Sequence, residues 1–115
     1  MMEQLGAKDF EERRLRRPGT WVVAYLADWC PFCRAFRPLF AGLDASGRLA
    51  CAVADLSDTE NPLWDDFGIN VVPTVIAFRN GDVIGRLDGV AMVGLDAQDL
   101  AGFLATLGLP APRPP

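Results

Sequence analysis

The chain has 115 residues, half of them hydrophobic, and a formal net charge of −4. That length fits one compact domain with its own core, and the acidic balance argues against nucleic acid as a partner, since its phosphate backbone needs a basic surface. No stretch approaches the roughly 18 apolar residues of a membrane helix, and the charged N-terminus lacks the apolar core of a secretory signal, so we expect a cytoplasmic protein without a membrane partner.

Charged side chains dominate the first 17 residues, and we interpret residues 3–17 as a helix. Glu12 and Arg16 are four residues apart, the spacing of neighbours on one helix face. The arginines at positions 13, 14, 16 and 17 lie near the expected helix end, where positive charge is favourable. We therefore favour a solvated helix end over a binding patch, followed by a turn at Pro18-Gly19.

Residues 21–27 are apolar throughout and rich in β-formers, which predicts a central strand covered on both faces. A helix is expected to begin at Pro31, because proline suits the first helical turn. Its apolar residues recur at helical spacing and predict one buried stripe, formed by Phe36, Leu39, Phe40 and Leu43.

Two further apolar runs predict strands, at residues 49–56 and 74–78. A short helix is expected between them at residues 61–67. Asn80-Gly81 is a strong hairpin signal, so residues 82–87 are predicted to return as a strand beside residues 74–78.

The chain closes with a predicted helix, which Asp96 caps and Gly108 ends, and a proline-rich tail. We expect residues 110–115 to be disordered and residues 1–109 to form the one domain. Strands that alternate with helices predict parallel neighbours, and the hairpin predicts an antiparallel edge. The fold class is therefore α/β, with a central mixed sheet flanked by helices on both faces.

Three cysteines and no histidine narrow the chemistry of the chain. An odd number of cysteines is not a disulfide framework, and a structural zinc site needs four ligands. Cys30 lies where a strand feeds a helix, so its thiolate would meet unpaired backbone N–H groups and the positive helix end. Cys33 is one turn further on and could attack a mixed disulfide formed by Cys30. Cys51 lies within a predicted strand, and we interpret it as a core residue.

A Cys-x-x-Cys pair by itself also fits half of a zinc site or a chance spacing. Its place between a strand and a helix, directly after Trp29 and without further ligands, favours redox chemistry. For Trp29 itself, packing in the core is the open alternative. The acidic residues at 58–60 and 65–66 lack the ligand spacing of a calcium loop, so no metal site is expected.

Residues 27–34, Ala-Asp-Trp-Cys-Pro-Phe-Cys-Arg, resemble the active-site segment of the thioredoxin family. The further matches are Pro38, Val72-Pro73-Thr74, Phe78, Asn80-Gly81 and Gly89. The resemblance extends from about Asp9 to Leu107. It implies a thioredoxin fold and a thiol–disulfide oxidoreductase that uses no metal or organic cofactor.

The resemblance also implies roles for single residues. Cys30 corresponds to the nucleophile and Cys33 to the resolving thiol. Pro73 corresponds to a cis proline, whose bond turns the backbone of Val72 toward an incoming chain. Gly89 corresponds to a glycine that lets a substrate backbone approach. The residues implied to bind substrate are Trp29, Val72, Pro73 and Gly89.

The sequence departs from the family pattern at several positions, among them Leu26, where the family usually carries Trp. Pro31-Phe32 stands where thioredoxins carry Gly-Pro, and we expect these two residues to tune the reduction potential. Residues 1–7 show no counterpart of the family's first strand, and Ala24 replaces a buried aspartate. Asp55, at the end of a predicted strand, is our candidate for the missing carboxylate in proton transfer. The alternative is that Asp55 caps a turn through Ser57.

The implied partners are disulfide-containing protein substrates and a reductase protein that returns electrons to the cysteine pair; we expect a monomer. An alternative in the same class is a net oxidant or a glutathione-linked, glutaredoxin-like reductase. A second alternative, from a different functional class, is a redox-inactive module that binds partners, because a fold alone does not establish catalysis. Its variant is an iron–sulfur cluster held by Cys30 of two subunits.

Overall fold

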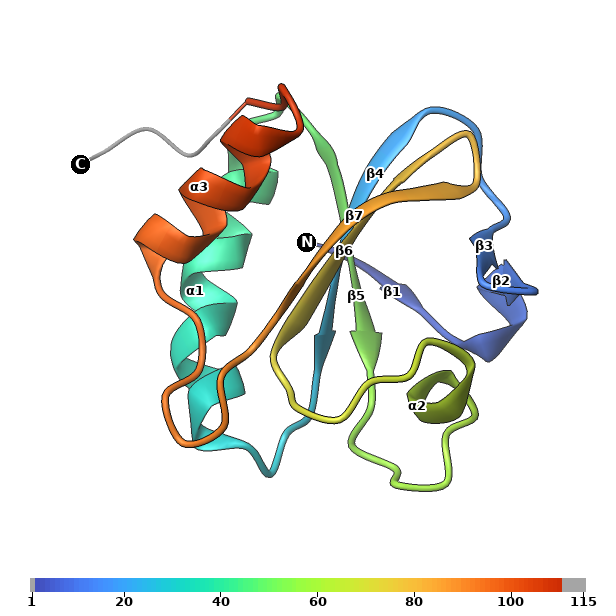
Figure 1. The fold of residues 1–115 in the computed structure, drawn as a ribbon, viewed down its shortest axis with the longest axis vertical. Helices are drawn as coiled ribbons and strands as arrows, with labels where there is room; N and C mark the ends of the chain where they lie inside the picture. Colours follow the sequence, from blue (N-terminus) through green and yellow to red (C-terminus); the bar gives the residue numbers. More distant parts are fainter. Residues whose placement is uncertain (1, 111–115) are drawn as a thin grey trace.

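Five strands form one mixed sheet in the computed structural model, which describes residues 2–110 of the chain (Figure 1). The order across the sheet is β1-β5-β4-β6-β7. The strands, in that order, span Glu3–Leu5, Ala50–Asp55, Thr20–Leu26, Thr74–Arg79 and Asp82–Asp88. All four strands expected from the sequence are therefore confirmed, and β1 is an addition.

Strand β4 lies at the centre of the sheet and pairs with a neighbour on each side. It runs parallel to β5, with Trp21 opposite Ala50 and Leu26 opposite Asp55, and antiparallel to β6. The residues from Val22 to Leu26 are all fully buried. Because both faces of the strand are covered, its sequence is apolar without alternation.

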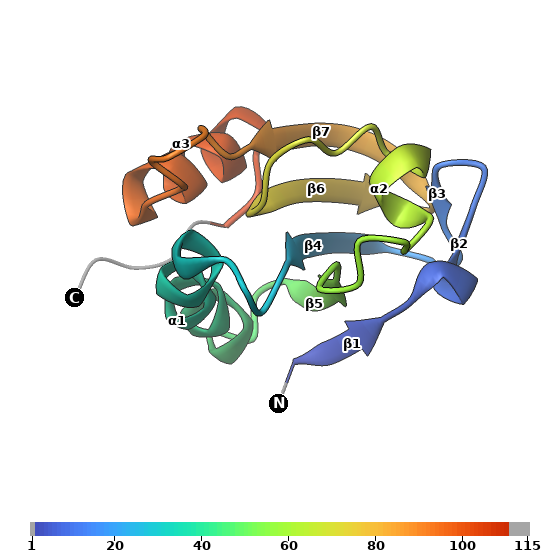
Figure 2. The same cartoon turned by 90° about the horizontal axis from the view of Figure 1, so that it is seen from below.

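Helices cover both faces of the sheet, which confirms the expected α/β class (Figure 2). Helices α1 (Pro31–Ala45) and α3 (Ala97–Thr106) lie on one side, and α2 (Leu63–Asp66) lies on the other. Asp96 caps α3 as expected, since its carboxylate accepts the N–H of Asp99 at 2.8 Å and the carboxylate of Asp99 accepts the N–H of Asp96 at 3.0 Å.

The expected helix at residues 3–17 does not form, so this prediction is wrong. The segment contains β1, a 3₁₀ turn at Ala7–Asp9, and a hairpin of β2 (Phe10–Glu11) and β3 (Arg14–Leu15). Its buried apolar side chains, Leu5, Phe10 and Leu15, are five residues apart, a spacing that makes no helical stripe. Strand β1 pairs in parallel with β5 and supplies the first strand that the sequence did not reveal.

The second correction concerns β6, which we expected to lie parallel to its neighbour because a helix separates it from β5. Leu26 lies opposite Asp55 and Tyr25 lies opposite Thr74, so β6 begins at the same edge of the sheet at which β4 and β5 end. The four residues of α2 do not carry the chain back to the opposite edge, as a parallel crossover requires. Strand β6 therefore runs antiparallel to β4.

At the chain's end, Gly108 has a left-handed φ of +69° just beyond α3, which confirms its expected role in ending that helix. Residues 111–115 of the expected disordered tail lie outside the described residues. Between Met2 and Pro110, no helix has both the length and the apolar character needed to cross a membrane.

Candidate active site

The two cysteines of the motif lie at the start of α1, directly after the loop that leaves β4. Cys30 is the N-cap residue of this helix and Pro31 is its first residue, as expected. The Cys30 Sγ accepts a hydrogen bond from the backbone N–H of Cys33 at 3.4 Å. A negative charge on this sulfur would therefore face both an N–H donor and the positive end of a 15-residue helix.

The surroundings of the two thiols differ. Cys30 is 5% exposed and borders a surface groove, whereas Cys33 is 1% exposed and points into the core. Burial raises the pKa of the Cys33 thiol, and the neighbouring Cys30 raises it further. Cys33 is therefore held as a neutral thiol at neutral pH, while Cys30 is the sulfur that an incoming molecule can reach.

Backbone from the loop that precedes β6 completes the site. The peptide bond between Val72 and Pro73 is cis, as expected from the resemblance. The Cys30 thiol donates a hydrogen bond to the Val72 carbonyl oxygen at 3.5 Å. This contact brings the loop before β6 against the start of α1, although Cys30 and Val72 are 42 positions apart in the chain.

Gly89 lies behind this loop, just after β7. A Cβ atom at position 89 would lie closer to the carbonyl oxygen of Pro73 than real Cβ atoms approach one. The glycine is thus required by the packing of two segments of the chain itself, a reason that the sequence did not indicate. Its contact with a substrate stays a prediction.

Trp29 and Trp64 form the outer wall of the site. Their rings stack with centroids 6.3 Å apart and an interplanar angle of 8°. The indole Nε1–H of Trp29 donates to the carbonyl oxygen of Ser57 at 2.9 Å, yet 54% of Trp29 is exposed. Trp29 is therefore not a core residue, and the alternative reading that we left open for it is wrong.

A groove of about 320 Å³ passes over Cys30. Residues 29–32, 64, 70–72 and 91–92 line it, and none of them carries a charge. The sequence alone did not point to Trp64, Val71 or Met92 as site residues. A signal for Met92 was present: residues 90–93 are apolar, lie between two glycines and fit neither a strand nor a helix.

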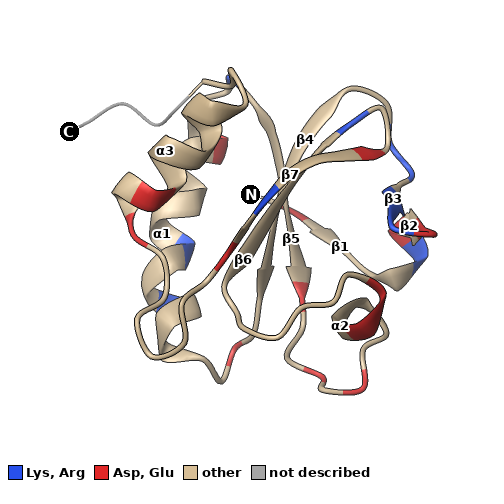
Figure 3. Cartoon of the chain, in the orientation of Figure 1, with Lys and Arg blue, Asp and Glu red and all other residues tan. Residues whose placement is uncertain are grey.

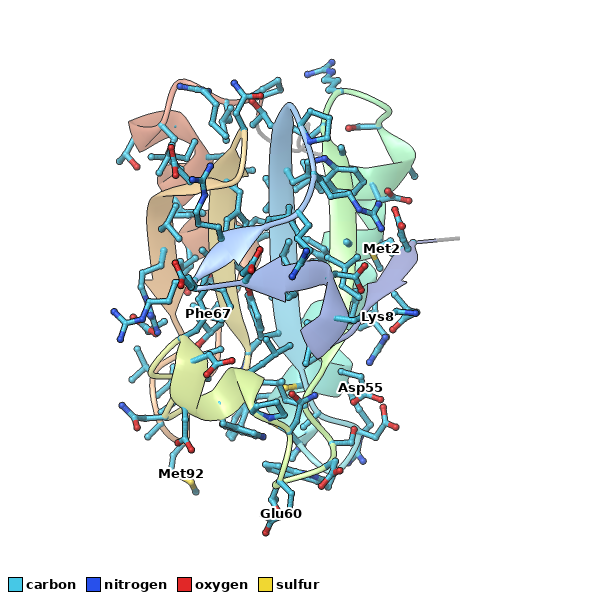
Figure 4. All side chains as sticks on the ribbon, turned by 90° about the vertical axis from the view of Figure 1, so that its right-hand side faces the viewer. Met2, Lys8, Asp55, Glu60, Phe67 and Met92 are labelled. Atoms are coloured by element: carbon cyan, nitrogen blue, oxygen red, sulfur yellow. The ribbon has the colours of Figure 1, made fainter. Side chains whose placement is uncertain are left out.

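Phe32, the second residue between the cysteines, packs on the loop that follows β7. This loop, residues 90–94, closes on itself, since the N–H of Gly94 donates to the Val90 carbonyl at 2.8 Å. At its tip, Met92 is 85% exposed and has a left-handed φ of 65°. Figure 4 shows the Met92 side chain projecting at the same end of the molecule as Glu60.

Asp55 lies at the exposed end of β5 and does not line the groove. Its Oδ1 accepts hydrogen bonds from the backbone N–H of Ser57 at 2.9 Å and from the Ser57 hydroxyl at 2.5 Å. The Ser57 Oγ in turn accepts the N–H of Asp28 at 2.7 Å. This is the turn-capping arrangement that we kept as the alternative for Asp55.

Figure 3 colours the charged residues along the ribbon, and the residues that line the groove are not among them. The arginines in the first two turns of α1 are engaged with Asp28: Arg37 pairs with its carboxylate at 3.6 Å, and Arg34 donates to its carbonyl oxygen at 3.3 Å. Within residues 2–110, no group of three or more His, Cys, Asp or Glu side chains could hold a metal ion.

Cys51 lies on β5, away from the helix start. It is 4% exposed, and its Sγ donates to the Leu49 carbonyl at 3.7 Å. Burial raises its pKa to about 12, and the negative charge of Asp44 adds to this effect. The interpretation of Cys51 as a core residue is confirmed.

Comparisons with known proteins agree with this geometry. A family model described as thioredoxin matches residues 1–104. Mitochondrial thioredoxin of Mus musculus is 31% identical over 101 residues, which are 86% of this chain and 58% of that protein. Thioredoxin of Rickettsia bellii is 30% identical over 83 residues, or 71% of this chain and 79% of that protein.

Solved structures show the same fold. The crystal structure of Chlamydomonas reinhardtii thioredoxin f2 superposes with a TM-score of 0.77 at 19% identity, over 96% of this chain and 99% of that one. The chain spans only 58% of the length of the mouse, rat and bovine mitochondrial proteins.

Proposed function

The chain belongs to the thioredoxin family, and on that premise we propose that it is a thiol–disulfide oxidoreductase that reduces protein disulfides through Cys30 and Cys33. One observation carries the proposal. The Cys30 sulfur caps α1, accepts the N–H of Cys33 and borders an open groove, while Cys33 is buried one turn behind it. This arrangement separates an attacking thiol from a resolving thiol.

The reaction moves two electrons from the cysteine pair to the substrate. The Cys30 thiolate attacks one sulfur of a substrate disulfide, whose S–S bond breaks and whose second sulfur leaves as a thiolate. The Cys33 thiol loses its proton and attacks the Cys30 sulfur of the mixed disulfide. The first substrate sulfur then leaves as a thiolate, a Cys30–Cys33 disulfide remains, and both released thiolates take up protons.

The surroundings of Cys30 are assigned supporting roles in this proposal. Trp29 and Val72 line the groove, and Pro73 follows Val72 through the cis bond. These three residues would contact the substrate segment, with Gly89 against Pro73. Pro31 and Phe32 would tune the potential. Asp55 caps the turn at Ser57 and lies at the exposed end of β5. A role for Asp55 in removing the Cys33 proton is therefore tested directly, with the variant Asp55→Asn.

The uncharged lining of the groove favours protein disulfides over glutathione disulfide. Glutathione carries two carboxylates, which need cationic partners when bound, and the two nearby arginines of α1 are engaged with Asp28. A net oxidant differs from a reductase only in its potential and its electron donor. We propose a reductase protein as donor; a monomeric, cytoplasmic protein stays a prediction of the sequence.

A redox titration tests the proposal. The reduced protein is equilibrated in glutathione buffers, quenched with an alkylating agent and weighed by mass spectrometry. We expect one Cys30–Cys33 disulfide with a potential of about −250 to −150 mV, between a reductase thioredoxin and a strong oxidant. Cys51→Ala, the matched control, should titrate like the wild type. A pair that stays reduced across this range contradicts the proposal and favours a binding module, and a coloured protein points to a metal cluster.

A further inference from the structure

The loop of residues 90–94 exposes three large apolar side chains to solvent. Val90, Met92 and Val93 are 58%, 85% and 69% exposed. Clusters of exposed apolar side chains mark interaction surfaces in soluble proteins. Met92 also lines the groove that passes over Cys30, so this surface is continuous with the reactive sulfur.

The loop is built to hold this position. Two hydrogen bonds end on the Val90 carbonyl, from the N–H groups of Val93 at 3.0 Å and of Gly94 at 2.8 Å. On its inner side, Gly94 packs against Phe32, where a Cβ on residue 94 would lie 2.9 Å from the Phe32 Cβ. The cysteine motif itself therefore supports the loop from below.

The left-handed backbone of Met92 points to a role for its side chain. A φ of 65° suits asparagine or glycine better than an unbranched apolar residue. Methionine has a flexible, polarisable side chain that adapts to apolar partners of different shape. At the tip of a closed loop, it adds a second wall to the groove, and stacked Trp29 and Trp64 contribute further apolar surface.

We propose that Met92 is a specificity-determining residue, which makes the protein select disulfides whose cysteine is flanked by large apolar side chains. The inference rests on the proposed function, because Cys30 fixes which atom of the partner enters the groove. The occupant is a segment of a protein that carries the disulfide. The uncharged lining favours apolar neighbours of that cysteine over charged or small polar ones.

The test uses two peptide disulfides of otherwise identical sequence, with Leu or with Ser on both sides of the cysteine. Second-order rate constants for their reduction by the reduced protein are measured by acid quench and chromatography. For the wild type we expect the Leu peptide to react about tenfold faster, the effect of partly burying one large apolar side chain.

Three variants isolate the Met92 side chain. Met92→Asn suits the left-handed backbone and removes only the apolar group, so the ratio of the two rates should fall to about threefold or less. Met92→Leu should keep the ratio. Val83→Thr alters another exposed apolar residue, on β7 and outside the groove, and should also keep it.

The outcomes separate this inference from the proposed function. A wild-type ratio near one, or an unchanged ratio in Met92→Asn, overturns the role of Met92 while leaving the oxidoreductase intact. A wild type that reduces neither peptide, or a Cys30→Ser variant that reduces both, overturns the proposed function and this inference together. A dimer that dissociates on Met92→Asn would assign the surface to a second copy of the chain and also overturn the inference.

Discussion

Gly94 packs directly on Phe32, with so little space between them that a Cβ on residue 94 would lie 2.9 Å from the Phe32 Cβ. The contact joins Phe32, the second of the two residues between the cysteines, to the loop of residues 90–94, which borders the groove over Cys30. A larger side chain at position 94, or a different one at position 32, should therefore shift the residue that it contacts.

Gly94→Ala should destabilise the protein through two effects. The new side chain meets an unfavourable φ of +81° and also collides with Phe32. Gly47→Ala is the matched control, because Gly47 has a φ of +70° and nothing within 4 Å of a built Cβ. We expect Gly94→Ala to lower the free energy of unfolding by about 1–3 kcal/mol more than Gly47→Ala, measured by urea denaturation. Equal decreases in the free energy of unfolding in the two variants would show that the loop moves away from Phe32 without loss of stability.

Alkylation near neutral pH should modify Cys30 far faster than the other two thiols. Cys30 lines the groove and caps α1, whereas burial raises the pKa of both Cys33 and Cys51. Iodoacetamide labelling at pH 7.5, followed by peptide mass spectrometry, should locate the fast site at Cys30, and Cys30→Ser should remove it. A fast thiol that persists in Cys30→Ser contradicts the assignment of the nucleophile.

Stability should fall as the pH rises above the ordinary thiol pKa near 9, in part because of Cys51. Its pKa in the folded protein is about 12, so between these values the unfolded chain has released a proton that the folded protein keeps. The stabilisation is complete below pH 9 and is lost as the pH approaches 12, at a slope of up to about 1.4 kcal/mol per pH unit for one proton. Cys51→Ala should flatten the curve of unfolding free energy against pH; an unchanged slope would mean that this thiol is not sequestered.

The hairpin turn between β2 and β3 offers a stabilising change. Glu12 and Arg13 both have left-handed φ values, 49° and 64°, in a turn that Asn-Gly would suit better. Replacing both, as Glu12→Asn with Arg13→Gly, should stabilise the protein by about 1 kcal/mol and raise Tm by about 4–8 °C in thermal unfolding. A lower Tm would instead indicate that contacts of the Arg13 side chain outweigh the backbone effect.

Asp55→Asn separates the two interpretations of that carboxylate. The amide oxygen still accepts hydrogen bonds from Ser57, so we expect disulfide exchange rates and their pH dependence to be unchanged. Asp55→Ala removes the acceptor and should lower the free energy of unfolding by about 1 kcal/mol. A slower Cys33 step in Asp55→Asn, with normal alkylation of Cys30, would instead establish proton transfer through Asp55.

The core of the site could be predicted because its signals are local. Each signal involves residues that are close in sequence and therefore close in space. A strand ends just before Cys30, a proline follows it, and Cys33 lies one helical turn further on. The same holds for the Asn80-Gly81 hairpin and the Asp96 cap.

Only the tertiary structure decided the remaining features, because each depends on contacts between distant segments. Charge patterning predicted a helix at residues 3–17, but Leu5 finds its place in β1 through pairing with β5. A helix before β6 predicted a parallel strand, yet α2 is too short to cross the sheet. Likewise, no local pattern brings Met92 to the groove: Gly94 and Phe32, 62 positions apart in the chain, pack together only once the sheet has formed.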